Sequence, residues 1–178
     1  MSPILCVMQR SRWSLIVILA TVVGTALIMG PPTPERIRWL IAARFPRVSW
    51  VDADTLAGWM RDDTRENLLL LDVRTEEEYA VSHLRGAVQM DPDGQGLSEL
   101  SIPDDATVVV YCSVGYRSGA IIEELRERGV EQVYNLTGGI FGWANAGRPL
   151  FRHDARVELV HPYDSVWGLL LRKDLRAD

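Results

Sequence analysis

Hydrophobic residues are distributed unevenly along the 178-residue chain, and their spacing divides it into four parts. Residues 13–29 contain no charged side chain, whereas residues 48–150 alternate between short apolar runs and apolar positions at helical spacing. We therefore divide the chain into an apolar N-terminal segment, a linker, a folded domain and a C-terminal extension, which span residues 1–30, 31–47, 48–150 and 151–178.

The apolar stretch at residues 13–29 predicts a single transmembrane helix. As a helix it would span roughly 25 Å, close to the thickness of a bilayer's hydrocarbon core. Arg10 and Arg12 precede it as in a secretory signal, but the residues before Pro31 lack the small pair typical of a cleavage site. We therefore expect an uncleaved, single-pass membrane anchor. The side of the membrane is left open because arginines flank the span at both ends.

The linker begins with Pro31 and Pro32, which hold the backbone extended and separate the span from the domain. Residues 35–45 then place Ile37, Leu40 and Ile41 at helical spacing. This pattern predicts a short amphipathic helix. Contact with lipid headgroups and packing onto the domain are equally good interpretations of its apolar face.

Residues 48–150 predict an α/β fold. Short apolar runs bounded by turn residues are typical of buried strands, here residues 48–51, 67–73, 86–90, 108–111 and 130–136. Helical spacing follows in residues 52–60, 75–81, 120–128 and 140–147, where Thr75 and Glu78 match a helix-capping box. Strands that alternate with helices imply a parallel sheet covered on both faces, with ligands bound beyond the carboxyl ends of the strands.

The strongest chemical signal follows the strand at residues 108–111. A strand that turns through a glycine-containing loop into a helix leaves backbone N–H groups directed into the loop, where an anion would bind. Cys112 is the first residue of this loop, and both the helix N-terminus and Arg117 would favour its thiolate over the thiol. The alternative is an unreactive cysteine buried in the core, but Gly115, Arg117 and Ser118, which follow it, favour a reactive cysteine.

The loop Cys112-Ser113-Val114-Gly115-Tyr116-Arg117-Ser118 resembles the active-site loop of rhodanese-like sulfurtransferases. Two further stretches agree with this resemblance, which covers residues 48–150. One is Leu71-Asp72-Val73-Arg74, followed by Glu77, Tyr79, His83 and Gly86-Ala87, and the other is Leu136, Gly138-Gly139-Ile140, Gly142-Trp143 and Gly147. The resemblance implies a rhodanese-like fold with a five-stranded parallel sheet flanked by helices, here preceded by the transmembrane helix.

The resemblance also implies a reaction. Cys112 would take a sulfane sulfur from a small anion such as thiosulfate as a persulfide, and a thiol, including a protein thiol, or cyanide would remove it. Arg117 would orient the anionic donor. The substrate-binding groups would be the backbone N–H groups of Ser113, Val114, Gly115, Tyr116, Arg117 and Ser118.

Three further residues are expected to support the site. Asp72 and Arg74 resemble the family's structural charged pair beneath the loop. His83 corresponds to a histidine of the family, and we interpret it as a hydrogen-bonded turn residue more than as a general base. Its neighbours Ser82 and Arg85 depart from the family's Gly-His-Ile-Pro-Gly-Ala run, which bears on the conformation of this turn.

Composition excludes several other classes of function. A formal charge of -5 provides no broad basic surface, so we expect no nucleic-acid partner. Two cysteines and three scattered histidines form no metal-binding pattern, and we expect neither a metal nor another cofactor.

Two alternatives to sulfur transfer remain. Phosphatases of related fold place five residues between the cysteine and the arginine, whereas Cys112 and Arg117 enclose four, which favours sulfur over phosphate. The second alternative is a non-catalytic module that docks a partner at the membrane or senses redox state through Cys112. Residues 151–178 suggest no function of their own, and either packing on the domain or contact with the membrane surface fits them.

Overall fold

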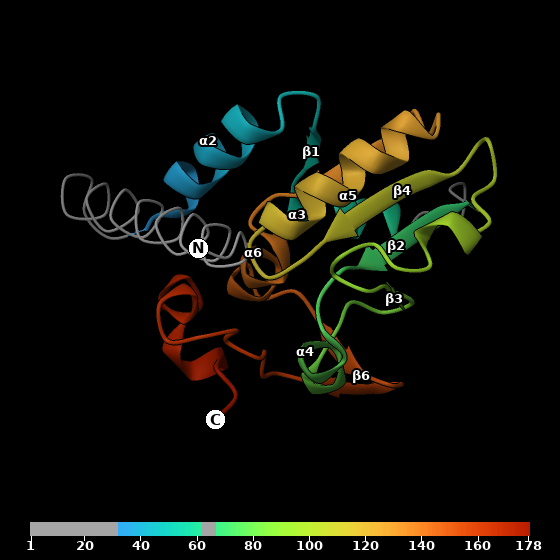
Figure 1. Ribbon diagram of the computed structural model, residues 1–178. Helices are drawn as coiled ribbons and strands as arrows, with labels where there is room; N and C mark the ends of the chain where they lie inside the picture. The colour runs from blue at the N-terminus through green and yellow to red at the C-terminus, as the bar shows by residue number, and fades with distance from the viewer. Residues whose placement is uncertain (1–31, 62–66) are drawn as a thin grey trace, which may run out of the picture. The chain divides into compact units, whose positions relative to one another are not determined.

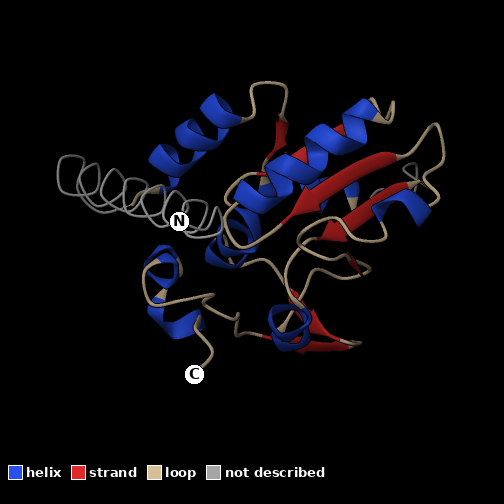
Figure 2. Cartoon of the chain, in the orientation of Figure 1, coloured by secondary structure: helices blue, strands red, loops and turns tan. Residues whose placement is uncertain are grey.

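The computed structural model describes residues 32–61 and 67–178. Residues 33–178 form one compact unit. This unit therefore includes the segments on either side of the predicted domain. It consists of a parallel sheet with helices on both faces and a separate two-stranded hairpin near the C-terminus (Figures 1 and 2).

The main sheet has five strands in the order β1-β5-β4-β2-β3, and every pair is parallel. The predicted five-stranded parallel sheet is therefore confirmed. Its strands are β1 (Ser49–Val51), β2 (Leu68–Asp72), β3 (Val88–Gln89), β4 (Thr107–Tyr111) and β5 (Val133–Leu136).

The central strand β4 is buried along its whole length. Its residues Val108, Val109 and Val110 are β-branched and fully buried, as expected for a strand that is covered on both faces. The strand lies between β5 and β2 in the sheet. Cys112, the residue after Tyr111, is therefore at the carboxyl edge of the sheet.

Neighbouring residues of β5 show which helices cover each face. The side chain of Asn135 bonds to Ser118 of α5 (Tyr116–Glu127), whereas Tyr134 packs edge to face against Trp59 of α3 (Ala53–Trp59). Successive strand residues point to opposite faces, so α5 and α3 lie on opposite sides of the sheet. The ring of Phe45, which follows α2 (Pro34–Arg44), contacts Tyr116, so α2 packs beside α5 (Figure 1).

Several elements differ from the sequence prediction, and one is the strand expected at residues 130–136, which begins at Val133. The helix expected from residue 120 begins at Tyr116, because Gly115 adopts a left-handed φ of 106° and ends the loop there. The strand expected at residues 86–90 forms sheet pairs only at Val88 and Gln89. It is an edge strand, and only the last two residues of β2 pair with it.

Helices α4 and α3 begin at side chains that cap their first turns, whereas α6 begins after a glycine with no side-chain cap. Thr75 and Glu78 form the predicted capping box of α4 (Glu76–Val81), and Asp52 accepts a hydrogen bond from the Thr55 N–H at the start of α3. Gly138 precedes α6 (Gly139–Asn145) in a left-handed conformation.

Both flanking segments pack on the domain. Ile37 and Ile41 of α2 are buried and contact the domain, whereas Leu40, expected on the same apolar face, is exposed. After the hairpin of β6 (Leu150–Arg152) and β7 (Ala155–Val157), the C-terminal segment buries Val160 and Leu171 and contains the short helices η2 (Trp167–Leu170) and η3 (Lys173–Leu175).

The predicted transmembrane helix at residues 13–29 lies outside the described residues. Across residues 32–61 and 67–178, the helices are too short or too polar to cross a bilayer. The single-pass membrane anchor therefore remains a prediction from the sequence.

Candidate active site

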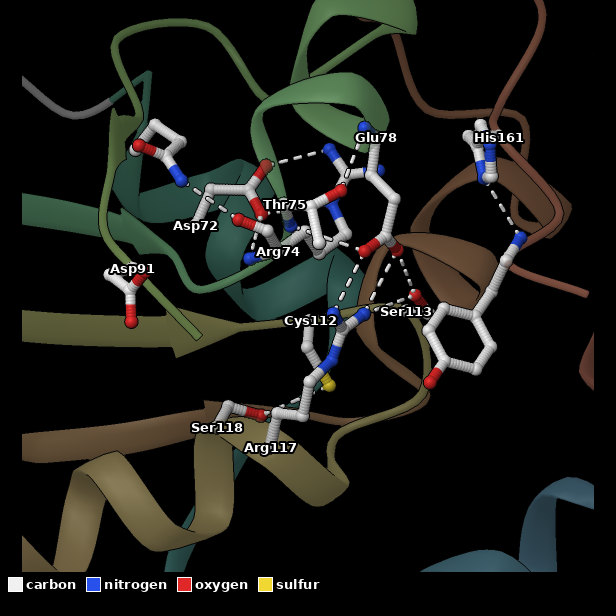
Figure 3. A network of polar contacts seen from close by, with 12 residues as sticks. Asp72, Arg74, Thr75, Glu78, Asp91, Cys112, Ser113, Arg117, Ser118 and His161 are labelled. Atoms are coloured by element: carbon white, nitrogen blue, oxygen red, sulfur yellow. Dashed lines mark hydrogen bonds and ion pairs between the residues drawn. The ribbon is translucent and has the colours of Figure 1, made fainter. Parts of the chain in front are cut away.

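Cys112 lies where β4 ends and the loop leads into α5 (Figure 3). The Gly115 N–H donates a hydrogen bond to Sγ at 3.1 Å, and the Ser118 hydroxyl lies 3.7 Å from the same sulfur. The 12-residue helix α5 also directs its positive N-terminal end toward the loop. The N–H group and the positive helix end make this an electropositive site, whereas the Ser118 hydroxyl donates its one proton to Asn135 Oδ1 at 2.8 Å. Cys112 is only 1% exposed, and it reaches solvent through a pocket described below.

Helix α6 holds the backbone of the loop from the other side. The Ile140 N–H donates to the Cys112 carbonyl at 2.9 Å, and the Phe141 N–H donates to the Ser113 carbonyl at 3.1 Å. Gly139 makes this approach possible. A Cβ atom there would overlap the Cys112 carbonyl oxygen and lie 2.6 Å from that of Ser113.

We expect Gly139→Ala to lower the free energy of unfolding by at least about 2 kcal/mol, because a left-handed φ of 56° and the overlap with the loop both oppose a side chain. Chemical denaturation followed by circular dichroism measures this effect. The matched control is Gly58→Ala in α3, where a Cβ meets open space and alanine favours the helix. Equal stabilities of the two variants would contradict this account of the loop.

Glu78 of α4, whose side chain is buried, connects the loop to α5 through an ion pair with the partly exposed Arg117. Its two carboxylate oxygens accept hydrogen bonds from Arg117 Nη1 and Nη2 at 2.8 and 2.9 Å, and Oε1 also accepts one from the Ser113 hydroxyl at 2.8 Å (Figure 3). Burial would raise the pKa of Glu78, but the hydrogen bonds and charge of Arg117 outweigh burial and lower this pKa to about 2. Glu78 is therefore a carboxylate at neutral pH.

Arg117 lines the pocket of Cys112 and is also bonded to Glu78, and its expected role in orienting the donor anion stays a prediction. Burial would lower the pKa of its guanidinium, but the hydrogen bonds to Glu78 and the nearby sulfur of Cys112 raise it. Both terminal nitrogens are bonded to Glu78, and the side chain is 22% exposed. Much of its charge is thus balanced by a carboxylate, and only part of the guanidinium faces the pocket.

The role of Glu78 was missed at the sequence level. Its place in the capping box gives a complete local explanation for a glutamate at this position. The partner Arg117 lies 39 residues away along the chain, and only the parallel sheet brings the two residues together.

Asp72 and Arg74 form a fully buried pair at the end of β2. Arg74 donates to both carboxylate oxygens at 2.8 and 2.7 Å and also to the Ser82 carbonyl at 2.6 Å. Burial would lower the pKa of Arg74, but the charge and hydrogen bonds of Asp72 raise it. The pair joins the end of β2 to the turn after α4, and these contacts are those of a residue pair that supports the fold.

His83 occupies that turn. Its Nδ1 lies 3.1 Å from the Tyr79 carbonyl oxygen, and its ring stacks on the Tyr79 ring with centroids 4.0 Å apart. Its backbone exchanges hydrogen bonds with Phe151 of β6. These contacts attach the hairpin to the turn.

A pocket of about 110 Å³ opens beside the loop, and the C-terminal segment forms one of its sides. Sequence reasoning assigned no function to this segment because its short helices carry no periodic apolar pattern. The pocket is lined by Cys112, Ser113, Val114, Tyr116, Arg117, Tyr163 and Trp167.

Within the described ranges, no group of acidic, cysteine or histidine side chains is arranged to hold a metal ion.

Comparison with known proteins identifies the family of the chain. The rhodanese-like domain family matches residues 52–146, so the chain belongs to this family. A sulfurtransferase of Allochromatium vinosum is 35% identical over 103 residues, which cover 58% of this chain and 94% of that protein. The thiosulfate sulfurtransferase GlpE of Actinobacillus succinogenes is 36% identical over 85 residues, which cover 48% of this chain and 77% of GlpE.

A solved structure agrees with the fold. The crystal structure of the Alr3790 protein from Anabaena sp. superposes with a TM-score of 0.52 and 25% sequence identity, covering 57% of this chain and 81% of that one. The family match and the relatives together support a sulfurtransferase.

Proposed function

We propose that this protein moves a sulfane sulfur from a small sulfur-containing anion, such as thiosulfate, to a thiol or cyanide through a persulfide on Cys112. The observation that carries this proposal is the sulfur of Cys112, which accepts a hydrogen bond from the Gly115 N–H at the N-terminus of α5 and faces an open pocket. The membership of the rhodanese-like family and the named sulfurtransferase relatives support it.

In the first step, the Cys112 thiolate attacks the outer sulfur of thiosulfate. A bond forms between Sγ and that sulfur, the sulfur–sulfur bond of thiosulfate breaks, and sulfite leaves with the bonding electrons. The negative charge then lies on the terminal sulfur of the persulfide. Hydrogen-bond donors placed where such charge develops contribute up to about 3 kcal/mol each.

In the second step, a thiolate or cyanide attacks the terminal sulfur of the persulfide. The bond to Sγ breaks, and its electrons return to Cys112 as the thiolate, so the cycle closes without an external oxidant or reductant. The Gly115 N–H and the positive end of α5 stabilise the thiolate both as nucleophile and as leaving group.

An assay of both half-reactions tests the proposal. We expect the purified protein to produce one sulfite and one thiocyanate for each thiosulfate consumed in the presence of cyanide. We expect no hydrolysis of 4-nitrophenyl phosphate, because Glu78 already occupies the terminal nitrogens of Arg117 that a phosphate would need. Phosphate hydrolysis without sulfite release would favour the phosphatase alternative, and inactivity in both assays would favour a docking module.

A further inference from the structure

The C-terminal segment from Val160 to Leu171 is held firmly beside the active-site loop. Val160 and Leu171 are both buried, and they fix the two ends of the segment. Asn145 of α6 donates to the Leu170 carbonyl at 2.8 Å and accepts from the N–H of Arg172, the residue that follows the segment, at 2.9 Å. The turn between these anchors is therefore a fixed part of the domain surface.

This turn places two aromatic side chains in the pocket of Cys112. Tyr163 and Trp167 both line it, and the Arg117 guanidinium lies 5.0 Å from the centre of the Tyr163 ring, within range of a cation–π contact. Tyr163 has a left-handed φ of 67°, uncommon for residues other than glycine, and its N–H donates to His161 Nδ1 at 3.0 Å. The Asp164 carboxylate accepts from the Trp167 N–H at 2.8 Å and positions the second ring.

The lining of the pocket is more apolar than a binding site for a small anion requires. Among the described residues that line it, Arg117 is the one cationic side chain, and it is paired with Glu78. Most of the remaining lining is provided by the side chains of Val114, Tyr116, Tyr163 and Trp167. At about 110 Å³ the pocket is smaller than the closed apolar cavity of about 150 Å³ that holds benzene, but it opens to solvent, so a phenyl group can pack against its apolar side and extend partly out of it.

We propose that Tyr163 and Trp167 form an aromatic wall that selects, as the sulfur acceptor, a thiol bearing an apolar group of about the size of a phenyl ring. This inference rests on the proposed function, because it names the acceptor of the same persulfide. The acceptor's carbon group packs against the two rings while its sulfur approaches the terminal sulfur on Cys112. A small polar thiol lacks this packing.

A comparison of two thiols under single-turnover conditions tests whether the aromatic wall selects the acceptor. The protein loaded with thiosulfate and freed of excess reagent is mixed with phenylmethanethiol or with 2-hydroxyethanethiol, two primary thiols of similar acidity, and the loss of the persulfide is followed by intact mass. We expect phenylmethanethiol to react about 10-fold faster at equal low concentration. The reason is that aromatic contacts of ordinary strength add to the burial of its phenyl group. Trp167→Ala and Tyr163→Ala should each bring this ratio closer to one.

Leu169→Ala is the matched control, because Leu169 is an exposed apolar residue of the same segment that does not line the pocket. It should keep the ratio of the unchanged protein. A ratio near one in the unchanged protein, or a ratio that Trp167→Ala and Tyr163→Ala leave unaltered, would overturn the inference.

A second measurement separates this inference from the proposed function. If Cys112 takes up no sulfur from thiosulfate, the proposed function fails, but the wall is still testable by alkylation of the thiol. N-benzyl iodoacetamide should then modify Cys112 faster than iodoacetamide does, and Trp167→Ala should remove this preference. Equal alkylation rates in the unchanged protein would refute the wall itself.

Discussion

Cys112→Ser is expected to reduce the rate of sulfur transfer by at least about 10⁴-fold. Loss of an enzyme's nucleophile typically has an effect of this size or larger, and a hydroxyl cannot form the persulfide. The substitution retains the size and shape of the buried side chain and leaves the Gly115 N–H with an acceptor. Steady-state production of thiocyanate from thiosulfate and cyanide measures the loss.

The matched control is Cys6→Ser, which removes the other cysteine of the chain. Cys6 lies outside the described residues and outside the family match, so this variant should retain full activity. Both variants should keep a cooperative thermal transition. Substantial activity in Cys112→Ser would show that sulfur transfer does not pass through this residue.

Glu78→Gln is expected to lower the free energy of unfolding by about 3 kcal/mol at neutral pH. The substitution keeps the shape of the side chain but removes the charge that balances the buried part of Arg117, and breaking one side of a buried pair costs about this much. Ser113 also loses a charged acceptor for its hydroxyl. Denaturant unfolding at pH 7 measures the difference from the unchanged protein.

The contribution of Glu78 to the free energy of unfolding should decrease as the pH falls. Its pKa is about 2 in the folded protein against an ordinary value of 4.5, so its contribution is complete above about pH 4.5 and is lost as the pH falls toward 2. The stability difference between the unchanged protein and Glu78→Gln should therefore shrink over this range. Glu76→Gln, at an exposed position in the first turn of the same helix, is the control and should change stability by less than about 0.5 kcal/mol at either pH. A difference that stays constant with pH would contradict the assigned ion pair.

The sequence predicted the sheet and the position of the nucleophile for identifiable physical reasons. The run Val108–Tyr111 is too apolar to lie anywhere but inside, and the glycine, arginine and serine after Cys112 define a strand–loop–helix turn. Strand order came from the resemblance to a family, because local patterns carry no information on which strands are neighbours.

Other parts of the site depend on contacts between distant segments. Glu78 reaches Arg117 across 39 residues, and nothing in the pattern around either residue indicates the other. Tyr163 and Trp167 come from a turn and a short 3-10 helix, which lack the periodicity that identifies longer elements. The start of α5 was placed four residues too late because the left-handed conformation of Gly115 allows the helix to begin at once.

The proposed sulfur transfer by this protein requires a persulfide at Cys112, and peptide mapping by tandem mass spectrometry tests its formation directly. After treatment with thiosulfate, the peptide containing Cys112 should gain the mass of one sulfur atom and lose it again when a thiol or cyanide is added. An unmodified Cys112 peptide, or a sulfur that is found only on Cys6, would contradict the account.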